Sequence, residues 1–399
     1  MITNIPKHWK IKKLGEICKV NQGLQIAIEE RFTEPIENGY FYITNEFLKA
    51  NSKTKYYIKN PSKSVLCSKE DILMTRTGNT GIVVSDVEGV FHNNFFKIDY
   101  DKKLLHKDYF VYYLKNDRMQ YDILVKAGNS TIPDLNHSDF YTLQIAISSL
   151  EEQEKIAEIL LTFDKAIRLT TQIISQLKQR NQGLAQQLLT GEKRVKGFEN
   201  SVWKEVRLGE IGFFFKGKGV SKNKIIDKGF KCLTYGDLYT KYDFIIKDVK
   251  SFIDKETALI SQEIRYGDIC FAGSGETLED IGKCATFIDD EIGYAGGDII
   301  VFRTKQNPIT MSYLLNSDIV KKQKTKMGQG HSVVHIYSSQ LEKLEVSLPS
   351  ITEQNAIAQI LDTAHQELKL YEQKLQLLQA QKKTLMQKLL TGEVLTIKK

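Results

Sequence analysis

The sequence contains no long apolar run. Among its 399 residues there is no stretch of about eighteen consecutive apolar residues, which excludes a transmembrane helix. The opening residues, MITNIPKHWKIKK, also lack the apolar segment of a secretory signal. The sequence therefore predicts a cytoplasmic protein with no membrane partner.

Cysteine is scarce and its spacing is uninformative. The five cysteines are Cys18, Cys67, Cys232, Cys270 and Cys284. Their number is odd and no two have the spacing of a zinc or redox motif, so we expect reduced thiols and no zinc site. The formal net charge of +7 permits a nucleic-acid partner without requiring one.

Recognisable catalytic motifs are also lacking. Residues 212–218 read GFFFKGK and have the spacing of a phosphate-binding loop, but Gly219 stands where Ser or Thr would hold Mg²⁺. His331 and His335 have the spacing of a metal-binding pair, but no third ligand is near them in the sequence. No Ser-His-Asp or Cys-His arrangement can be read from spacing. The sequence predicts a chain with no active site and no metal of its own.

One segment is present twice. Residues 148–192 read SSLEEQEKIAEILLTFDKAIRLTTQIISQLKQRNQGLAQQLLTGE, and residues 349–393 read PSITEQNAIAQILDTAHQELKLYEQKLQLLQAQKKTLMQKLLTGE. The copies align without a gap at an offset of 201 residues. Glu-Gln recurs near the start of each copy, and Leu-Leu-Thr-Gly-Glu closes both. A repeat at a fixed offset indicates a duplicated architecture.

Each copy has the pattern of a long helix that pairs with the other copy. Residues 148–190 contain no proline, and apolar residues recur every three or four positions with one lapse at Asn181, which aligns with Lys382. Ser149 followed by Glu152 predicts a capping box, and Gly191 a helix C-terminus. Forty residues would span about 60 Å. The predicted pairing residues are Ile156, Leu160, Phe163, Ile167, Ile174, Leu177, Leu184, Leu188, Ile357, Leu361, Leu368, Leu375, Leu378, Leu385 and Leu389. In the alternative, each helix folds back into a local core, which its length disfavours.

The segments between the helices predict mixed α/β domains. In the first, strands are expected at 40–44, 71–75, 81–84 and 95–98, and a helix at 109–126. The second echoes it, because WKIKKLGEI at 9–17 recurs as WKEVRLGEI at 203–211. Gly23 also aligns with Gly217, which indicates a shared turn.

The predicted fold class is α+β, with two mixed α/β domains separated by a pair of long antiparallel coiled-coil helices and a pseudo-twofold internal repeat. The domain boundaries we expect are 1–147, 148–192, 193–347 and 348–399.

Polar loops and lysine clusters predict contacts with DNA. Arg76-Thr77-Gly78-Asn79-Thr80-Gly81 follows a predicted strand, and Gly273-Ser274-Gly275-Glu276-Thr277 is its counterpart. Arginine can bind a guanine edge and asparagine an adenine edge, while lysines typically contact phosphates. An ordinary solvated surface is the alternative for each lysine cluster. The candidate DNA-binding residues are Lys53, Lys55, Arg76, Thr77, Asn79, Thr80, Asn93, Lys216, Lys218, Lys222, Lys224, Ser274, Glu276, Lys322 and Lys324.

Taken with these motifs, the whole chain resembles the specificity (S) subunit of type I restriction-modification systems. The resemblance rests on the order of two variable domains and two repeated helices. It rests also on Leu-Pro-x-x-x-Glu-Gln-x-x-Ile-Ala-x-x-Leu at 348–361, on Leu-Leu-Thr-Gly-Glu at both helix ends, and on Trp-x₄-Leu-Gly-Glu-Ile at the start of each half. Ser148-Ser149 replaces the proline that precedes the second helix, a small departure.

The resemblance implies a non-catalytic subunit that recognises DNA sequence. Each variable domain would be a target recognition domain that reads one half of an asymmetric bipartite site on double-stranded DNA. The helices would set the spacer and dock two methyltransferase (M) subunits, which use S-adenosylmethionine for adenine N6 methylation. Two restriction (R) subunits would use ATP and Mg²⁺ for translocation and cleavage. No cofactor would be bound by this chain.

Two other functions remain open from the residues alone. One is a coiled-coil assembly protein whose end domains bind other proteins. The other is a self-sufficient DNA enzyme with a split active site. Salt-dependent binding to duplex DNA separates the first from a specificity subunit, and activity of the purified chain alone separates the second.

Overall fold

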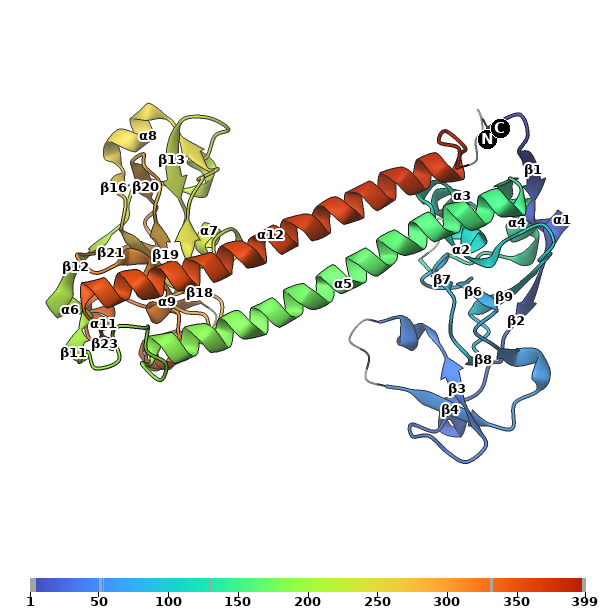
Figure 1. Cartoon of the computed structure of the whole chain (residues 1–399), viewed down its shortest axis with the longest axis horizontal. Coiled ribbons are helices and arrows are strands. Elements are labelled where there is room, and N and C mark those ends of the chain that lie inside the picture. Colours follow the sequence, from blue (N-terminus) through green and yellow to red (C-terminus); the bar gives the residue numbers. More distant parts are fainter. Residues whose placement is uncertain (1–4, 50–51, 53, 129–130, 331–332, 397–399) are drawn as a thin grey trace. The chain divides into compact units, whose positions relative to one another are not determined.

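A computed structural model describes residues 5–49, 52, 54–128, 131–330 and 333–396 (Figure 1). The chain divides into two compact units, of which unit 1 is Met1–Thr171 with Lys374–Lys399, and unit 2 is Gln172–Gln373. Each unit therefore holds one α/β domain, part of one long helix and part of the other. Of the helices that the structure describes, none combines the length and the hydropathy that a membrane span needs.

Unit 1 is built from two four-stranded sheets and a two-stranded ribbon. The first sheet has the order β2 (Cys18–Gln22), β9 (Phe95–Tyr100), β6 (Ile72–Thr75), β7 (Val83–Val84). The second has the order β4 (Tyr56–Lys59), β3 (Gly39–Ile43), β8 (Gly89–Phe91), β5 (Leu66–Cys67). β3 and β8 run parallel and the other neighbours run antiparallel. The ribbon pairs β1 (Lys10–Lys13) with β10 (Gln144–Ile147).

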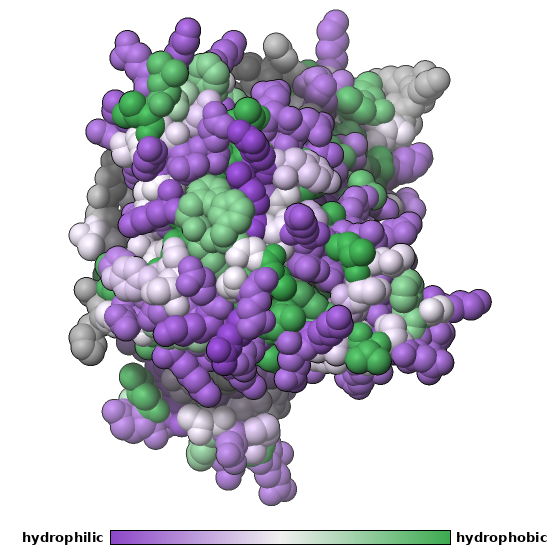
Figure 2. Space-filling view, turned by 90° about the vertical axis from the view of Figure 1, so that its left-hand side faces the viewer, coloured by the Kyte–Doolittle hydropathy of each residue, from purple (hydrophilic) through white to green (hydrophobic). Residues whose placement is uncertain are grey.

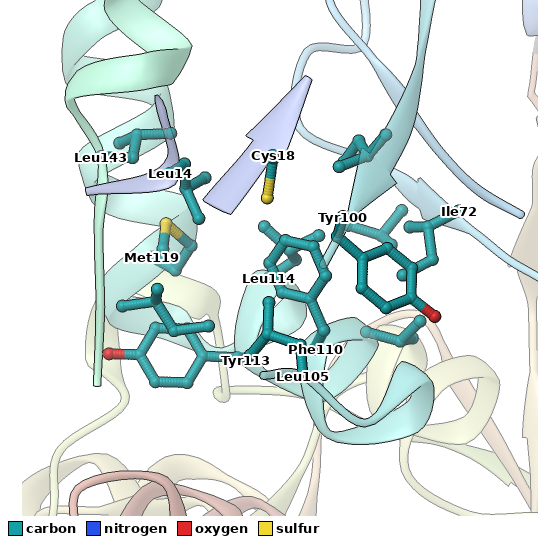
Figure 3. Packing of buried hydrophobic residues seen from close by; sticks show 14 of the residues in the cluster. Leu14, Cys18, Ile72, Tyr100, Leu105, Phe110, Tyr113, Leu114, Met119 and Leu143 are labelled. Carbon is teal, nitrogen blue, oxygen red and sulfur yellow. The ribbon is translucent and has the colours of Figure 1, made fainter. Parts of the chain in front are cut away.

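The main core of unit 1 lies between the first sheet and the helices. Figure 3 shows strand residues such as Cys18, Ile72 and Tyr100 packed with Phe110 and Leu114 from the helical side. These and the other core residues are buried because burying apolar surface is the main favourable contribution to folding. The unit's helices are α1 (Leu14–Ile17), α2 (Lys107–Lys115), α3 (Asp117–Ala127) and α4 (His137–Thr142).

The single helix predicted over 109–126 is in fact two helices, which corrects the sequence interpretation. The break falls at Asn116, whose side-chain oxygen accepts a hydrogen bond from the Met119 N–H at 2.9 Å and so caps α3. Asparagine is a strong helix N-cap because it satisfies an amide that has no partner within the helix. Apolar residues continue across the break because α2 and α3 pack against the same core.

Unit 2 repeats the strand order of unit 1. Its first sheet has the order β12 (Gly212–Lys216), β21 (Ile299–Thr304), β17 (Ile269–Ala272), β19 (Cys284–Phe287), β14 (Ile245–Ile246). Its second has the order β15 (Phe252–Ile253), β13 (Phe230–Leu233), β20 (Gly293–Ala295), β16 (Gln262–Ile264). β11 (Lys204–Arg207) pairs with β23 (Glu345–Leu348), and β18 (Ser274–Gly275) with β22 (Val334–His335). Among the described strands, β14, β18 and β22 have no counterpart strand in unit 1, and Thr77 and Asp134 form an isolated bridge at the place of β18 and β22. The predicted duplication of the domain is confirmed.

The shared turn at Gly23 and Gly217 has a steric cause. A Cβ atom on Gly23 would lie 2.1 Å from the Phe91 carbonyl oxygen, and one on Gly217 would lie 2.1 Å from that of Gly296. Both turns therefore need glycine for close backbone approach. The remaining helices of unit 2 are α6 (Leu208–Ile211), α7 (Tyr235–Thr240), α8 (Lys255–Ile260), α9 (Pro308–Leu315), α10 (Asp318–Met327) and α11 (Ser338–Leu341).

The two long helices are α5 (Leu150–Leu189) and α12 (Ile351–Leu390). They pack antiparallel: in unit 2, Lys178 pairs with Glu372 at 2.9 Å and Arg180 with Glu367 at 2.6 Å. All of the predicted pairing residues are buried or half-buried. The helix ends also join the domain cores, since Ile156 and Leu389 belong to the core of unit 1. The helices pair as predicted and do not fold back, although their ends also contribute to the domain cores.

The helix ends largely follow the predicted capping. Ser149 accepts a hydrogen bond from the Glu152 N–H at 3.3 Å, but the Glu152 carboxylate does not return it and binds Trp9 instead, so the capping box is only half formed. Gly191 and Gly392 have φ of +74° and +73°. This left-handed conformation favours glycine and ends both helices after their common Leu-Leu-Thr.

All five cysteines are free, as expected for reduced thiols, and all are buried. Burial raises the pKa of the Cys18 thiol to about 12 and that of Cys67 to about 11. The thiolate is the reactive form. These cysteines are therefore unreactive packing residues.

Candidate nucleic-acid interface

The Arg76 loop of unit 1 lies where β6 ends. Arg76 Nη2 donates to both carboxylate oxygens of Asp134, at 3.0 and 2.8 Å, and the Thr77 hydroxyl also donates to this carboxylate. The guanidinium carbon of Arg76 lies 5.5 Å from the centre of the Phe96 ring. In the free chain, Asp134 and Phe96 therefore hold the arginine in place beside Thr77.

The same site in unit 2 has different chemistry. Ser274 Oγ and His335 Nδ1 lie 3.0 Å apart, at the positions that align with Thr77 and Asp134. Gly273 replaces Arg76, so the guanidinium has no counterpart. His331, the other half of the dismissed metal pair, lies outside the described residues, among which no cluster of three metal-ligating side chains occurs. The two domains therefore have equivalent loops at this place, but the side chains on those loops differ.

The remaining loop candidates divide into framework and exposed residues. Thr80 is 7% exposed and its hydroxyl donates to the Arg76 and Pro133 carbonyls, at 3.0 and 2.7 Å. Ser274 is likewise buried. Asn93 is half-buried and donates to Gln25 Oε1 at 2.5 Å. Asn79 and Glu276 are exposed, so they are the loop side chains most available to a ligand.

Four lysines form an exposed basic segment in unit 2. Lys216, Lys218, Lys222 and Lys224 follow one another from the end of β12 into the next loop, and all are exposed. None makes an ion pair with another residue of the described structure, so their charges are available to phosphates. Lys55 in unit 1 and Lys322 on α10 are exposed in the same way, whereas Lys53 lies outside the described residues.

Lys324 differs from these lysines, because its side chain is part of the core. It is 2% exposed, and its ammonium donates to the Gly282 carbonyl at 2.7 Å above the Phe271 ring. Burial lowers its pKa. Its aligned residue in unit 1 is Ile123, which is fully buried. A phosphate cannot reach the buried Lys324 ammonium, although the sequence had suggested Lys324 as a DNA-binding residue.

The surface beside β11 and β12 of unit 2 is mostly hydrophilic, as Figure 2 shows. Apolar residues on this face form small groups separated by hydrophilic ones. Exposed aromatic side chains are present in the unit, including Phe213 and Tyr266. A polar surface with unpaired lysines suits contact with DNA, whose interfaces are more polar and more positively charged than those between proteins.

The repeated Glu-Gln clamps each long helix to its own domain, a role that the sequence reasoning missed. The Gln153 side chain accepts from the His106 N–H at 2.9 Å and donates to the Leu104 and Ser148 carbonyls. Gln354 accepts from the Asn307 N–H at 3.0 Å and donates to the Pro349 carbonyl in the same way. The recurrence of the pair at both helix starts was the available signal.

The glutamate of the pair binds the opening tryptophan directly in unit 1, whereas in unit 2 it binds Arg194, which lies over the tryptophan ring. Glu152 accepts from Trp9 Nε1 at 3.0 Å. Glu353 is fully buried and accepts from Arg194 Nε and Nη2, both at 3.0 Å, while the Arg194 guanidinium lies over the Trp203 ring. We name the Glu-Gln pair of each unit its helix clamp.

The apolar pattern of the long helices is interrupted at Asn181 and at the aligned Lys382. The polar contact predicted at this interruption is confirmed in both units. In unit 1, Lys382 Nζ donates to Asp164 at 2.6 Å. In unit 2, Asn181 donates to the Ala364 carbonyl at 2.8 Å. The contact at this position is therefore an ion pair in unit 1 and a neutral hydrogen bond in unit 2.

His92, beside the Arg76 loop, should make unit 1 sensitive to acid. Burial and the Arg31 charge lower its pKa to about 4, against about 6.5 in an unfolded chain. Between these values the unfolded state binds more protons, so stability is complete above pH ~6.5 and is lost as pH falls toward 4. We expect the melting temperature of unit 1 to drop over this range, and His92→Asn to flatten the drop. Calorimetry from pH 7 to 4.5 measures it, and an equal drop in the variant would contradict the assignment.

A family model matches almost the whole chain. The model described as "Type I restriction modification DNA specificity domain" matches residues 6–179 and again 200–380. The chain is 25% identical to the type I restriction enzyme MjaVIII specificity subunit of Methanocaldococcus jannaschii, over 98% of this chain and 94% of that protein. It is 24% identical to a putative MjaX specificity subunit of the same organism, over 98% and 95%.

Solved structures share the fold. The type I restriction-modification S subunit from M. genitalium superposes with a TM-score of 0.65 at 19% identity, covering 97% of each chain. A chain from a study of complex assembly and conformational transition of the type I R-M system gives 0.58 at 16% identity, covering 98% of this chain and 100% of that one. At these identities the likeness establishes the architecture of two α/β domains with two packed long helices.

Proposed function

Because this chain belongs to the DNA specificity family of type I restriction-modification systems and is a non-catalytic specificity subunit, we propose that each recognition domain reads one half of an asymmetric bipartite site. The helices α5 and α12 fix the unspecified spacer between the halves. The site lies on double-stranded DNA, whose base edges are accessible to loop side chains in the major groove.

One observation supports this proposal: both units have the same fold, but the side chains of their equivalent loops differ. Strand order, turn glycines and helix clamps are common to both units. At the end of the equivalent strand, unit 1 offers Arg76 with Asp134 and unit 2 offers Ser274 with His335. A different hydrogen-bonding set at the same place is what two different half-sites require.

The exposed lysines supply affinity that does not depend on sequence. Lys216, Lys218, Lys222 and Lys224 contact phosphates, and each neutralised phosphate steepens the salt dependence of binding. The aligned segment of unit 1 contains Glu29 and Glu30 and no lysine. The basic segment therefore anchors the half of the site that unit 2 reads.

The same frame docks two methyltransferase subunits, which bind S-adenosylmethionine and methylate adenine at N6. Restriction subunits supply ATP- and Mg²⁺-dependent translocation and cleavage. The pseudo-twofold repeat supports this assignment, because a surface that occurs twice in one chain can receive two copies of the same partner. This chain contributes recognition and spacing.

Mapping N6-methyladenine in cells that express this chain with its methyltransferase subunit tests the proposed function. Methylation should appear at one bipartite motif and disappear when the chain is deleted. Methylation without a bipartite motif, or none despite an active methyltransferase, would contradict it.

Replacing Arg76 by alanine should change recognition of one half-site and leave the other intact. Its pair with Asp134 is partly exposed, so the cost to stability should be about 0–1 kcal/mol. Methylation motif mapping measures the change. Asp134→Asn is the control, since it weakens the pair but keeps the guanidinium. Equal loss at all sequences would mean that Arg76 touches only phosphate.

A further inference from the structure

Each unit has a groove at the same place in the repeat. The groove of unit 1, of about 330 Å³, lies between the end of α12 and the corner where α2 meets α3. That of unit 2, also of about 330 Å³, lies between the end of α5 and the corner where α9 meets α10. The first is lined by Lys383, Met386, Gln387 and Leu390, and the second by the aligned Gln182, Ala185, Gln186 and Leu189. The grooves are therefore a duplicated feature of the frame.

In unit 1, Asp164 and Asn116, two polar residues whose aligned positions in unit 2 line the groove there, have hydrogen-bond partners. Asp164 accepts from the Tyr112 hydroxyl at 2.5 Å and from Lys382 Nζ at 2.6 Å. The Lys382 ammonium lies 5.0 Å from the centre of the Tyr112 ring. Asn116 is occupied in capping α3 through the Met119 N–H.

The aligned groups in unit 2 are not satisfied. His365 takes the place of Asp164 and Ser317 that of Asn116, and both line the groove. His365 is 9% exposed, and its Nε2 atom is buried without a hydrogen-bond partner in the described structure. Ser317 Oγ is also buried and unpartnered there. A buried polar atom without a partner costs free energy, so such atoms in a native protein call for a ligand or a water.

Two side chains at the groove of unit 2 are smaller than their aligned residues in unit 1. Asn181 replaces Lys382, and Ala185 replaces Met386, which lines the other groove. The groove of unit 2 is also lined by Phe244, Tyr313 and His365. Tyr112 and Asp164, which align with Tyr313 and His365, do not line the groove of unit 1. Phe244 stacks on Tyr313 with ring centres 4.2 Å apart, which provides an apolar wall.

The groove of unit 2 is suited to a neutral hydrogen-bonding group on an apolar side chain. Burial, and then the Lys369 charge, lower the pKa of His365, so the imidazole is neutral near pH 7. A neutral imidazole nitrogen can pair with an amide or hydroxyl. The aromatic wall would bury the apolar part of the same side chain.

We propose that the groove of unit 2 is the primary docking site of the methyltransferase subunit, whose inserted side chain hydrogen-bonds to His365 and Ser317, and that the groove of unit 1 binds the second copy more weakly. This inference rests on the proposed function and deepens it. The occupant follows from the duplication, because a groove that is present twice receives a partner present twice. The difference in affinity follows from hydrogen bonding. The side chain that enters the groove of unit 2 can pair with His365 and Ser317, which have unpartnered atoms, whereas the aligned Asp164 and Asn116 of unit 1 already have partners.

Titrating the separately purified methyltransferase subunit into the full chain, with native mass spectrometry, yields both stepwise affinities. The two steps should differ, and His365→Phe should weaken only the tighter one, by tenfold or more. The same variant should leave the melting temperature of the free chain unchanged or raised, because it removes an unpaired buried nitrogen. A merely structural histidine would lower both quantities. His365→Gln, which retains a terminal hydrogen-bonding group, should restore part of the affinity.

Reciprocal groove variants provide matched controls. Ala185→Met gives unit 2 the residue of unit 1 and should weaken the tighter step. Met386→Ala opens the groove of unit 1 and should leave that step unchanged. Equal steps in the natural chain, or unchanged affinity in both His365→Phe and Ala185→Met, would overturn this inference alone. If no complex forms with the natural chain, both the docking part of the proposed function and this inference fail.

Discussion

Arg194→Ala should lower the free energy of unfolding of unit 2 by about 3 kcal/mol. The Glu353 side chain is fully buried and Arg194 is its only cationic partner in the described structure. Removing the guanidinium leaves a buried carboxylate that only Ser201 can still serve. An unpaired buried charge is much more costly than the loss of a surface ion pair. Chemical denaturation followed by a probe in unit 2 measures the change.

The repeat provides a matched control in unit 1. His8 lies 3.3 Å from the Glu152 carboxylate, at a partly exposed position, and Trp9 continues to donate to that carboxylate when His8 is replaced. His8→Ala should therefore cost about 1 kcal/mol or less. Adding Glu353→Gln to Arg194→Ala should recover part of the loss, because it removes the unpaired charge. A loss for Arg194→Ala no larger than that for His8→Ala would refute the importance of the pair.

Shortening both long helices by four residues should shorten the spacer of the recognised motif by one or two base pairs. We would remove residues 170–173 from α5 and 374–377 from α12, since the pairs Asp164–Lys382 and Arg180–Glu367 lie on either side and keep their partners. Four residues span about 6 Å of helix, against about 3.4 Å for each base pair. Methylation motif mapping gives the spacer directly.

Deleting the residues from both helices keeps the antiparallel register, whereas a deletion from one helix would also shift the pairing. The control replaces the same residues by alanine and keeps the helix length, so its spacer should stay unchanged. A deletion variant that folds and methylates the original motif would refute the role of the helices in spacing.

The long helices could be predicted almost to the residue, because local signals determine them. Proline is absent, apolar residues recur at helical spacing, and Gly191 and Gly392 adopt the positive φ that ends a helix. The domain duplication was also readable, since Gly23 and Gly217 occupy positions that only glycine can fill. Features fixed by one or two neighbouring residues are the ones a single sequence reveals.

Two sequence predictions were wrong, one because of a local helix cap and one because of burial by distant residues. The helix over 109–126 was not divided because its apolar pattern continues across Asn116, although an asparagine at that point was a capping signal. Lys324 was grouped with its neighbouring lysines, but it occupies the inward position that Ile123 holds in unit 1. The repeat alignment could have indicated this burial.

The candidate site was only partly predictable, because it depends on residues that are distant in the sequence. Arg76 and Asp134 are 58 positions apart, and nothing in the sequence indicates that they meet. The unpartnered atoms of His365 and Ser317 are invisible until the surrounding helices are in place. The sequence was enough to locate the candidate DNA-binding loops, but only the structure shows which residues their side chains contact.

The helix clamps have a consequence for how such a protein can change. Gln153 and Gln354 bind mostly backbone groups of their domains, which any side chain at those positions would offer. The clamp therefore accepts any recognition domain that keeps the same backbone turn, provided that its core also packs on the helix residues that join it, such as Ile156 and Ile357. We expect that a whole recognition domain meeting both conditions could replace the present one. New DNA specificity could then arise by recombination in a single event, without a series of point mutations that must each preserve the frame.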